Sequence, residues 1–309
     1  MRIGVALAAS GEANYVDTMI DQAGQAAAAG LSSAWFGQRF DYDSAALAGL
    51  VGRAVPGLDV GTSAIPIFAR HPILVASQAQ TAQAATHGRY HLGMALGGPA
   101  MIEQAFGLRY ERPIALLREF LVALRSLLET GGADLHGELL TVAPPQPTAL
   151  PGAQPPVPVL VAAMGPQSLR VTGELADGTL PYLVGPKTLG DHIVPTITTA
   201  AERAGRPAPR IVAYVAGVVT ADVEATRGVA AQRMAFYDRV PSYQRVIALE
   251  GAERAADLTV VGDEETVAAA VRRYVDAGAT EVVFTQTDLA GDADRLRTWR
   301  LLGQLNQEG

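Results

Sequence analysis

Hydrophobic residues follow two alternating patterns along this chain. Short apolar runs such as RIGVAL (2–7) and TEVVFT (280–285) alternate with longer alanine-rich stretches that have a helical pattern. Several of the short runs are apolar without strict alternation, which is typical of parallel strands covered on both faces. Strands are therefore expected at 2–7, 33–37, 58–65, 89–96, 157–163, 178–184, 210–219 and 280–285. Helices are expected at 15–29, 43–53, 72–86, 112–130, 166–176, 186–204, over much of 222–277, and at 292–305.

This order of elements predicts an α/β protein with a (β/α)8 TIM-barrel fold. Eight strands, each followed by a helical segment within 309 residues, favour a barrel over an open doubly wound sheet. The first strand also lacks a G-x-G-x-x-G motif, which argues against a dinucleotide-binding fold.

Two segments exceed the strict repeat. Residues 131–158 are rich in proline and glycine and form an insertion before the fifth strand. Residues 222–257 hold extra helices before the eighth strand, broken at Pro241. In a barrel, such excess segments build lids and substrate pockets. Because no linker separates them from the rest, we expect a single domain over 1–309.

Composition narrows the class of protein. The chain has no cysteine, so disulfides, thiolate catalysis and cysteine-ligated metals are excluded. A net charge of −7 without a Lys/Arg block argues against a nucleic-acid partner, and no apolar run reaches the roughly 18 residues that span a bilayer. The opening MRIGVALAAS is too short and too weakly basic for a signal peptide. We therefore expect a cytoplasmic protein that acts on a small molecule, with no nucleic-acid or membrane partner.

In a barrel, the active site gathers at the carboxyl ends of the strands. The segments expected there are poor in acids, bases and metal ligands, which suggests a site for a cofactor that carries its own chemistry. His87 and His91 have a metal-ligand spacing, but Gly88 and Arg89 between them mark a helix end, so no metal site is expected. His71 precedes a helix, where a capping or packing role is expected. The strand-end segments are 10–12, 37–39, 63–66, 96–99, 164–165, 181–182 and Gly217.

The stretch VLVAAMGPQSL (159–169) combines a strand end with a helix start. Gly165 ends the strand, and Pro166 suits the first helical position, where a missing N–H costs nothing. The free N–H groups of Gln167 and Ser168 would then face the active side, where they can bind an anion. An ordinary strand–helix turn explains the same residues, and both interpretations stay open. In the same way, LDVGTSAIPIFARHP (58–72) suits either an ordinary X-Pro turn or a bulge that presses backbone against a flat ring.

Five motifs stand out along the chain. They are GTSAIPIFARHP (61–72), GRYHLGMALGGP (88–99), FGLRYERP (106–113), VPVLVAAMGPQSLRVTGELADG (157–178) and VGDEETVAAAVRRYVDAGATEVVF (261–284). Taken together, they resemble one known family, the bacterial luciferase-like monooxygenase superfamily, and most closely its coenzyme F420-dependent oxidoreductase branch. The resemblance covers essentially the whole chain, with the motifs in the family's order.

The resemblance implies a homodimeric barrel that binds coenzyme F420, or alternatively FMN. It implies a cis peptide bond between Ser63 and Ala64, in a bulge with Ile65, that supports the cofactor ring from behind. Leu96, Gly97 and Gly98 would line the pyrimidine side or the tail of the cofactor. The cofactor phosphate would be held by Ala163, Met164, Gly165, Pro166, Gln167 and Ser168.

The chain departs from the sugar-phosphate dehydrogenases of this branch. Their Asp-His pair after the second strand is replaced by Gln38 and Arg39, and their acidic residue after the fourth strand is replaced by Gly98. Oxidising an alcohol needs a group that accepts the hydroxyl proton, so the shortage of acids and bases favours a reductase.

Three residues are expected to contact the reacting groups. Gln38 would hydrogen-bond the cofactor or substrate, and Arg39 would either bind an anionic tail or form a surface salt bridge. Tyr182, with Tyr237 and Tyr243, would donate a proton or wall the substrate.

The predicted function is hydride transfer between C5 of reduced F420 and an activated C=C or C=N of a small organic substrate. The alternatives are an FMN-dependent monooxygenase on the same fold, and a relative that has lost its cofactor.

Overall fold

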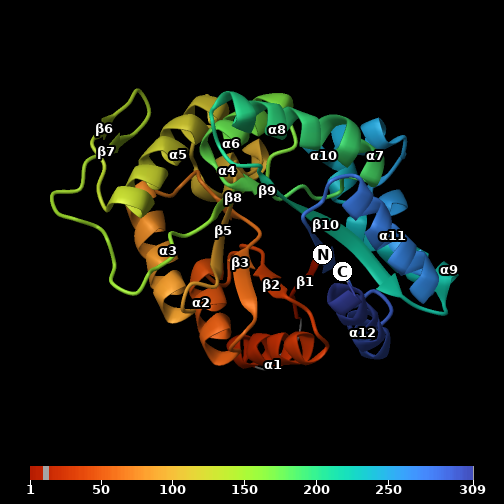
Figure 1. Ribbon diagram of the computed structural model, residues 1–309. Coiled ribbons are helices and arrows are strands. Elements are labelled where there is room, and N and C mark those ends of the chain that lie inside the picture. The colour runs from red at the N-terminus through yellow and green to blue at the C-terminus, as the bar shows by residue number, and fades with distance from the viewer. Residues whose placement is uncertain (10–13, 309) are drawn as a thin grey trace.

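A closed barrel of parallel strands forms the centre of the molecule. The computed structural model describes residues 1–9 and 14–308. Each barrel strand pairs in parallel with its neighbours, and β10 closes the ring by pairing with both β9 and β12 (Figure 1). The predicted (β/α)8 barrel is therefore confirmed. Its strands are β1 (Arg2–Ala6), β2 (Ser33–Phe36), β3 (Asp59–Thr62) continued by β4 (Ile65–Pro66), β5 (Tyr90–Ala95), β8 (Val159–Val161), β9 (Gly178–Thr179), β10 (Arg210–Val219) and β12 (Glu281–Thr285).

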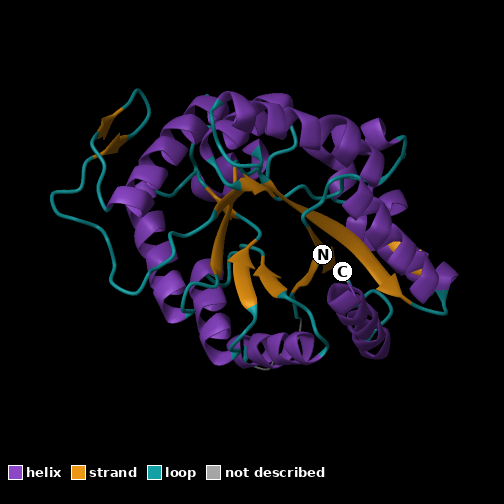
Figure 2. Cartoon of the chain, in the orientation of Figure 1, coloured by secondary structure: helices purple, strands orange, loops and turns teal. Residues whose placement is uncertain are grey.

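Helices surround the barrel on the outside (Figure 2). Several of these helices begin at a residue whose side chain caps the first turn. Asn14 and Asp43 accept hydrogen bonds from backbone N–H groups in the first turns of α1 and α2. His71 accepts one from Ile73 N at the start of α3. The capping role expected for His71 is thus confirmed. The helices that alternate with the barrel strands are α1 (Tyr15–Ala28), α2 (Ser44–Ala54), α3 (Pro72–Ala85), α5 (Pro113–Thr130), α6 (Pro166–Leu175), α7 (Pro186–Thr188), a π-helical turn (Leu189–Ile193), α8 (Val194–Arg203), α11 (Glu264–Asp276) and α12 (Asp292–Glu308).

The sixth barrel strand is shorter than the predicted 178–184. Pairing stops at Thr179 and resumes only as an isolated bridge between Tyr182 and Tyr214. Pro181 lies between Thr179 and Tyr182 and has no N–H to donate, which explains why the pairing is interrupted.

Four further elements lie outside the sequence prediction. The short helix α4 (Pro99–Phe106) follows the fourth barrel strand, and the 131–158 insertion contains a hairpin of β6 (Leu135–His136) and β7 (Thr141–Val142). The expectation of helix over much of 222–277 is wrong at β11 (Val260–Gly262), which pairs with β10. The strand forms because the ten-residue β10 extends past its barrel neighbours and leaves an edge to be covered. The remaining elements of this region are α9 (Val223–Met234), a 3-10 turn (Tyr237–Arg239), α10 (Pro241–Glu250) and a second 3-10 turn (Ala255–Leu258).

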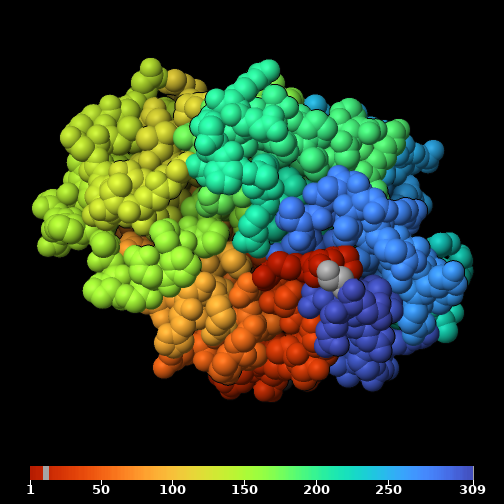
Figure 3. Space-filling view, viewed as in Figure 1, coloured from red at the N-terminus to blue at the C-terminus, as the bar shows by residue number. Residues whose placement is uncertain are grey.

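The two ends of the chain meet at one side of the barrel. In the space-filling view the N-terminal residues, in red, lie against the C-terminal helix, in blue (Figure 3). The Asn306 side chain accepts a hydrogen bond from Ile3 N at 2.8 Å, and β1 pairs with β12. No helix within residues 1–9 and 14–308 has the length and apolar character needed to cross a membrane.

Candidate active site

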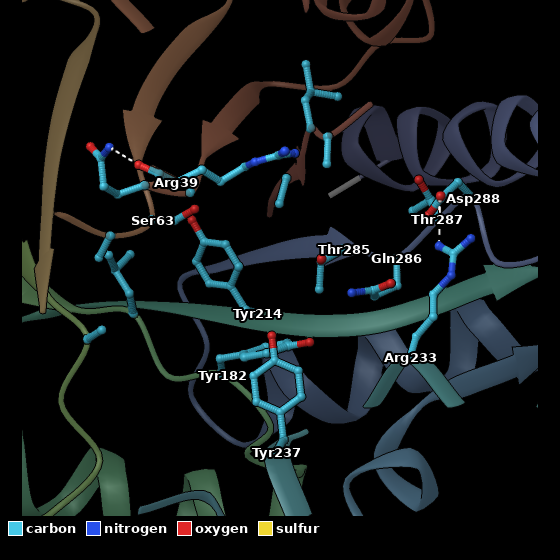
Figure 4. Close-up of a pocket in the computed structure, with 18 of the residues that line it drawn as sticks. Arg39, Ser63, Tyr182, Tyr214, Arg233, Tyr237, Thr285, Gln286, Thr287 and Asp288 are labelled. Carbon is cyan, nitrogen blue, oxygen red and sulfur yellow. Dashed lines mark hydrogen bonds and ion pairs between the residues drawn. The ribbon is translucent and has the colours of Figure 1, made fainter. Parts of the chain in front are cut away.

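A cavity of about 470 Å³ opens at the carboxyl ends of the barrel strands (Figure 4). Its volume falls in the range of small-molecule sites. Many of the residues that line it have small side chains, which leave room for a flat ring. These small residues are Ala6, Ala8, Gly37, Ser63, Ala64, Ala95 and Ala162.

The bond between Ser63 and Ala64 is cis, as the resemblance implied. Both residues line the cavity, at the junction where the third barrel strand passes from β3 to β4. Backbone, rather than a large side chain, therefore forms part of the cavity surface at this point. Ile65 lies next to them and is buried in the core.

Tyr214 lines the cavity, although its sequence context gave no sign of a functional role. It lies on β10, and its hydroxyl points toward Ser63 (Figure 4). That hydroxyl is buried and makes no well-formed hydrogen bond among the described residues, and the Ser63 side chain is its polar neighbour. Burial raises the pKa of Tyr214 well above its ordinary value, so the phenol stays protonated at neutral pH and can donate one hydrogen bond or proton. In the sequence, Tyr214 is one aromatic residue within an apolar strand, where packing is the usual role.

Gln38 lines the cavity, but its amide is held by protein groups. Its Nε2 donates to Arg39 O at 2.6 Å and to Tyr42 O at 2.5 Å. Its Oε1 accepts from Ser44 N at 3.2 Å and also from the side chains of Ser44 and Arg70. Because both amide protons are used, these bonds give Gln38 the role of holding the β2–α2 loop. The predicted contact with cofactor or substrate would require breaking them.

Arg39 forms a two-pronged ion pair with Asp41, at 3.0 and 2.8 Å. Its guanidinium lies 5.8 Å from the ring centres of both Tyr15 and Tyr42, which stack on each other. The structure thus shows the salt-bridge alternative for this side chain. Arg39 also lines the cavity, and binding of an anionic tail stays a prediction.

Tyr182, Tyr237 and Tyr243 form one aromatic wall of the cavity. The Tyr182 ring meets the other two edge to face, at 5.3 and 6.0 Å, and its hydroxyl contacts Met234 Sδ at 3.7 Å. Burial raises the pKa of all three phenols, so they are neutral at physiological pH. Two of the three come from the 222–257 segment, which therefore builds part of the pocket, as its excess length suggested.

A second cavity of about 410 Å³ adjoins the first and shares Gln38, Arg39, Ala64 and Ala95 with it. Gly97 lines it, together with apolar side chains and three basic ones. The basic residues are Arg39, Arg70 and His71.

The predicted cofactor residues are only partly brought together around these cavities. Ser63 and Ala64 line the first, and Ala64 and Gly97 line the second. The others lie at the same edge of the barrel but line neither cavity. These are Ile65, Leu96, Gly98, Ala163, Met164, Gly165, Pro166, Gln167 and Ser168.

At the start of α6, Gly165 is the N-cap residue and supplies no side chain for capping. The Ser168 hydroxyl donates to Gly165 O at 2.9 Å, so it does not cap the first N–H groups either. These N–H groups lack intrahelical partners, as in any helix. An anion site and an ordinary turn both suit this geometry, and the phosphate site stays a prediction.

His87 and His91 have different surroundings. His87 contacts Arg53, whereas His91 lies inside the barrel, 3.3 Å from Asp59 Oδ2 and 3.2 Å from Arg210 Nη1. No group of three or more potential His, Cys, Asp or Glu metal ligands occurs within residues 1–9 and 14–308.

The segment 10–12, which was also expected at a strand end of the active side, lies outside the described residues.

A closed (β/α)8 barrel with a cavity of this size at its strand ends is a small-molecule-binding TIM barrel. Comparison with known sequences identifies its family. The chain belongs to the luciferase-like monooxygenase family, whose model matches residues 1–281. An uncharacterised protein of Mycobacterium tuberculosis is 32% identical over 206 residues, which cover 63% of this chain and 61% of that protein. The chain thus aligns with about three fifths of the length of this relative. The phthiodiolone/phenolphthiodiolone dimycocerosates ketoreductase of Mycobacterium kansasii is 33% identical over 248 residues, 75% of this chain and 66% of that enzyme.

Solved structures with the same fold include enzymes of both cofactor types. The coenzyme F420-dependent tetrahydromethanopterin reductase of Methanopyrus kandleri superposes with a TM-score of 0.76 at 21% identity, covering 98% of this chain and 97% of the other. An F420-dependent secondary alcohol dehydrogenase in complex with an F420-acetone adduct gives 0.80 at 18% identity, covering 97% of each chain. The oxygenating constituent of 3,6-diketocamphane monooxygenase from Pseudomonas putida, in complex with FMN, gives 0.79 at 17% identity, covering 98% and 97%. At these identities the likeness shows the fold alone.

Proposed function

We propose that this protein is a coenzyme F420-dependent reductase that acts on an activated C=C or C=N of a small organic substrate. The observation that carries the proposal is the chemistry of the first cavity. Among its described lining residues the one carboxylate is Asp288, which is paired with Arg233 at 2.8 Å, and no histidine is present. A site that oxidises an alcohol needs a group to accept the hydroxyl proton, whereas a reductase needs a proton donor. The protonated tyrosines supply donors.

The residues present fit a flat tricyclic ring. The small side chains at the strand ends leave room for it, and the Ser63–Ala64 backbone forms the surface behind it. When bound there, a reduced deazaflavin would supply the hydride that the substrate double bond needs. Tyr214 would supply the proton, because its buried hydroxyl stays protonated and makes no well-formed hydrogen bond among the described residues. The tyrosine wall excludes water and orients the substrate.

The second cavity is the place proposed for an anionic cofactor tail. Arg39 and Arg70 line it, each paired with an aspartate that a stronger anion would have to displace, and it adjoins the first cavity at Ala64 and Ala95. A ring in the first cavity could thus extend a charged tail into the second. In this proposal the phosphate lies near the start of α6, and the protein is a homodimer.

Relatives with F420 in their names support the choice of cofactor. A putative coenzyme F420-dependent oxidoreductase of Mycobacterium tuberculosis is 28% identical over 151 residues, 45% of this chain and 43% of that protein. The FMN complex with the same fold keeps an FMN-dependent monooxygenase as the second candidate.

Titrating the cofactor-free full-length protein with F420 and with FMN separates the candidates. We expect F420 to bind at least about tenfold more tightly, a difference of about 1.4 kcal/mol. Reduced F420 should then be oxidised without oxygen when an enone or imine is added. Tighter FMN binding with oxygen uptake would favour the monooxygenase instead, and binding of neither would indicate a relative without a cofactor.

A further inference from the structure

The first cavity has two chemically different ends (Figure 4). Ser63 lies at the end that suits the ring. Arg233, Thr287 and Asp288 lie at the opposite end, beyond Thr285 and Gln286. The polar end is formed by α9, the β12–α12 connection and α12.

Arg295 of α12 is the least satisfied charge at this polar end. Its side chain is 12% exposed and lines the cavity, and its Nε has no partner among the described residues. Its Nη2 lies 3.4 Å from Asp292, whose side chain is 85% exposed, so that ion pair is weak.

Trp299 holds the Arg295 guanidinium in place. The guanidinium lies 4.9 Å from the centre of the indole ring, within cation–π range. Trp299 is itself fixed, because its Nε1 donates to Thr287 Oγ1 at 3.1 Å. A guanidinium positioned on a rigid platform loses little conformational freedom when it binds a ligand.

The charge balance at this end leaves one positive charge. Arg233 and Asp288 neutralise each other at 2.8 Å, and Arg295 is left with a solvent-exposed aspartate. A carboxylate carries one charge, and its two oxygens match the guanidinium fork. A phosphate monoester carries close to two charges, more than this end offers.

We infer that the Arg295 end of the cavity is a carboxylate subsite and that the substrate is an unsaturated organic acid. Its carboxylate contacts Arg295, its apolar body lies against the tyrosine wall, and its double bond reaches the Ser63 end. The position of the double bond rests on the proposed function, whereas the carboxylate subsite does not.

Calorimetric titration of the cofactor-free full-length protein tests the subsite, with trans-cinnamate and its neutral counterpart trans-cinnamamide as probes. We expect cinnamate to bind at least about tenfold more tightly than the amide. Arg295→Gln should weaken cinnamate binding by about tenfold or more and leave the amide within about threefold. Arg295→Lys, which keeps the charge but not the fork, should fall between.

Two further variants control the experiment. Arg300→Gln removes the same charge from an exposed position of the same helix, outside the cavity, and should change neither affinity. Asp292→Asn removes the competing carboxylate and should strengthen cinnamate binding alone. This variant keeps the test decisive if Arg295→Gln does not fold.

Equal binding of the two probes by the wild type, or full cinnamate affinity in Arg295→Gln, would overturn the subsite. The proposed function fails separately. If cinnamate binding depends on Arg295 but F420 does not bind, the subsite stands and the reductase does not. If F420 binds and cinnamate does not, the carboxylate subsite is ruled out and the proposed reductase is not.

Discussion

The residues around the first cavity differ in whether their polar atoms are already used. The Gln38 amide makes hydrogen bonds to the loop it belongs to, so a polar residue at a strand end acts here as a support. The Tyr214 hydroxyl makes no well-formed hydrogen bond among the described residues. It lies on β10, whose sequence is otherwise mostly apolar and predicts only core packing. A buried donor without a partner is costly, and a ligand that accepts its hydrogen bond would remove that cost.

Replacing Tyr214 with phenylalanine tests this hydroxyl. We expect turnover of reduced F420 with an enone to fall by at least about tenfold, because a positioned proton donor typically contributes more than that. The free energy of unfolding should stay within about 0.5 kcal/mol or rise, since no well-formed protein hydrogen bond is lost. Steady-state kinetics and urea unfolding measure the two effects.

Tyr90→Phe is the matched control. The Tyr90 hydroxyl is also buried without a partner, but Tyr90 lines neither cavity. Its removal should leave turnover unchanged. If Tyr214→Phe turns over as the wild type does, the proton comes from elsewhere.

Among the elements, the start of α6 is either an ordinary strand–helix turn or the site that holds the cofactor phosphate. Gly165 has φ of −83°, which any residue can adopt, and a Cβ added there would meet Ser168 Oγ at 3.6 Å, an ordinary contact. Stability therefore does not require glycine at this position. Glycine would be required if a ligand approached the backbone closely here.

We expect Gly165→Ala to fold with wild-type stability or up to about 1 kcal/mol more, because alanine restricts the unfolded chain. It should weaken F420 binding by about tenfold, since the methyl group would obstruct the N–H groups that hold the phosphate. Fluorescence titration with F420 and a thermal melt give the two values.

Gly228→Ala in α9 is the control, because a Cβ there meets nothing within 4 Å. It should leave cofactor affinity unchanged. Wild-type F420 affinity in Gly165→Ala would favour the ordinary turn.

At the scale of the whole molecule, a charged network inside the barrel joins strands that are far apart in the sequence. Glu281 is 1% exposed and accepts hydrogen bonds from Ser33, Trp35 and Arg210. His91 links Arg210 to Asp59, which also pairs with Arg2. These residues belong to β1, β2, β3, β5, β10 and β12.

The network makes stability depend on pH through Asp59. Burial alone would raise the pKa of its carboxyl, but the hydrogen bond with His91 and the charges of His91 and Arg2 outweigh burial, and the pKa lies below its ordinary value. The stabilisation is therefore fully present above the unfolded-state pKa of about 3.9 and is lost as the pH falls through the folded-state value.

Asp59→Asn should accordingly lower the free energy of unfolding by about 1–2 kcal/mol at pH 7. The difference from the wild type should shrink as the pH falls below about 4. Urea unfolding at several pH values measures it, with the exposed Asp17→Asn as control. A difference that is constant with pH would contradict the assignment.

The order of elements could be predicted from the sequence because it depends on local patterns. Apolar runs, cap residues and helix starts such as His71-Pro72 act within a few residues, so eight barrel strands and their helices were expected close to where they lie. The short strand β11 escaped prediction because it depends on the exposed edge of β10. The cis bond at Ser63–Ala64 was expected from resemblance, since no local pattern requires it.

The sequence by itself determined the barrel, its family and the edge at which the site lies. The tertiary structure alone decided which polar groups at that edge are available. Hydrogen-bond partners are chosen by distance in space, so only the folded chain shows that the Gln38 amide is occupied and the Tyr214 hydroxyl is not. For the same reason, only the fold could bring Arg295, Trp299 and Ser63 to one cavity.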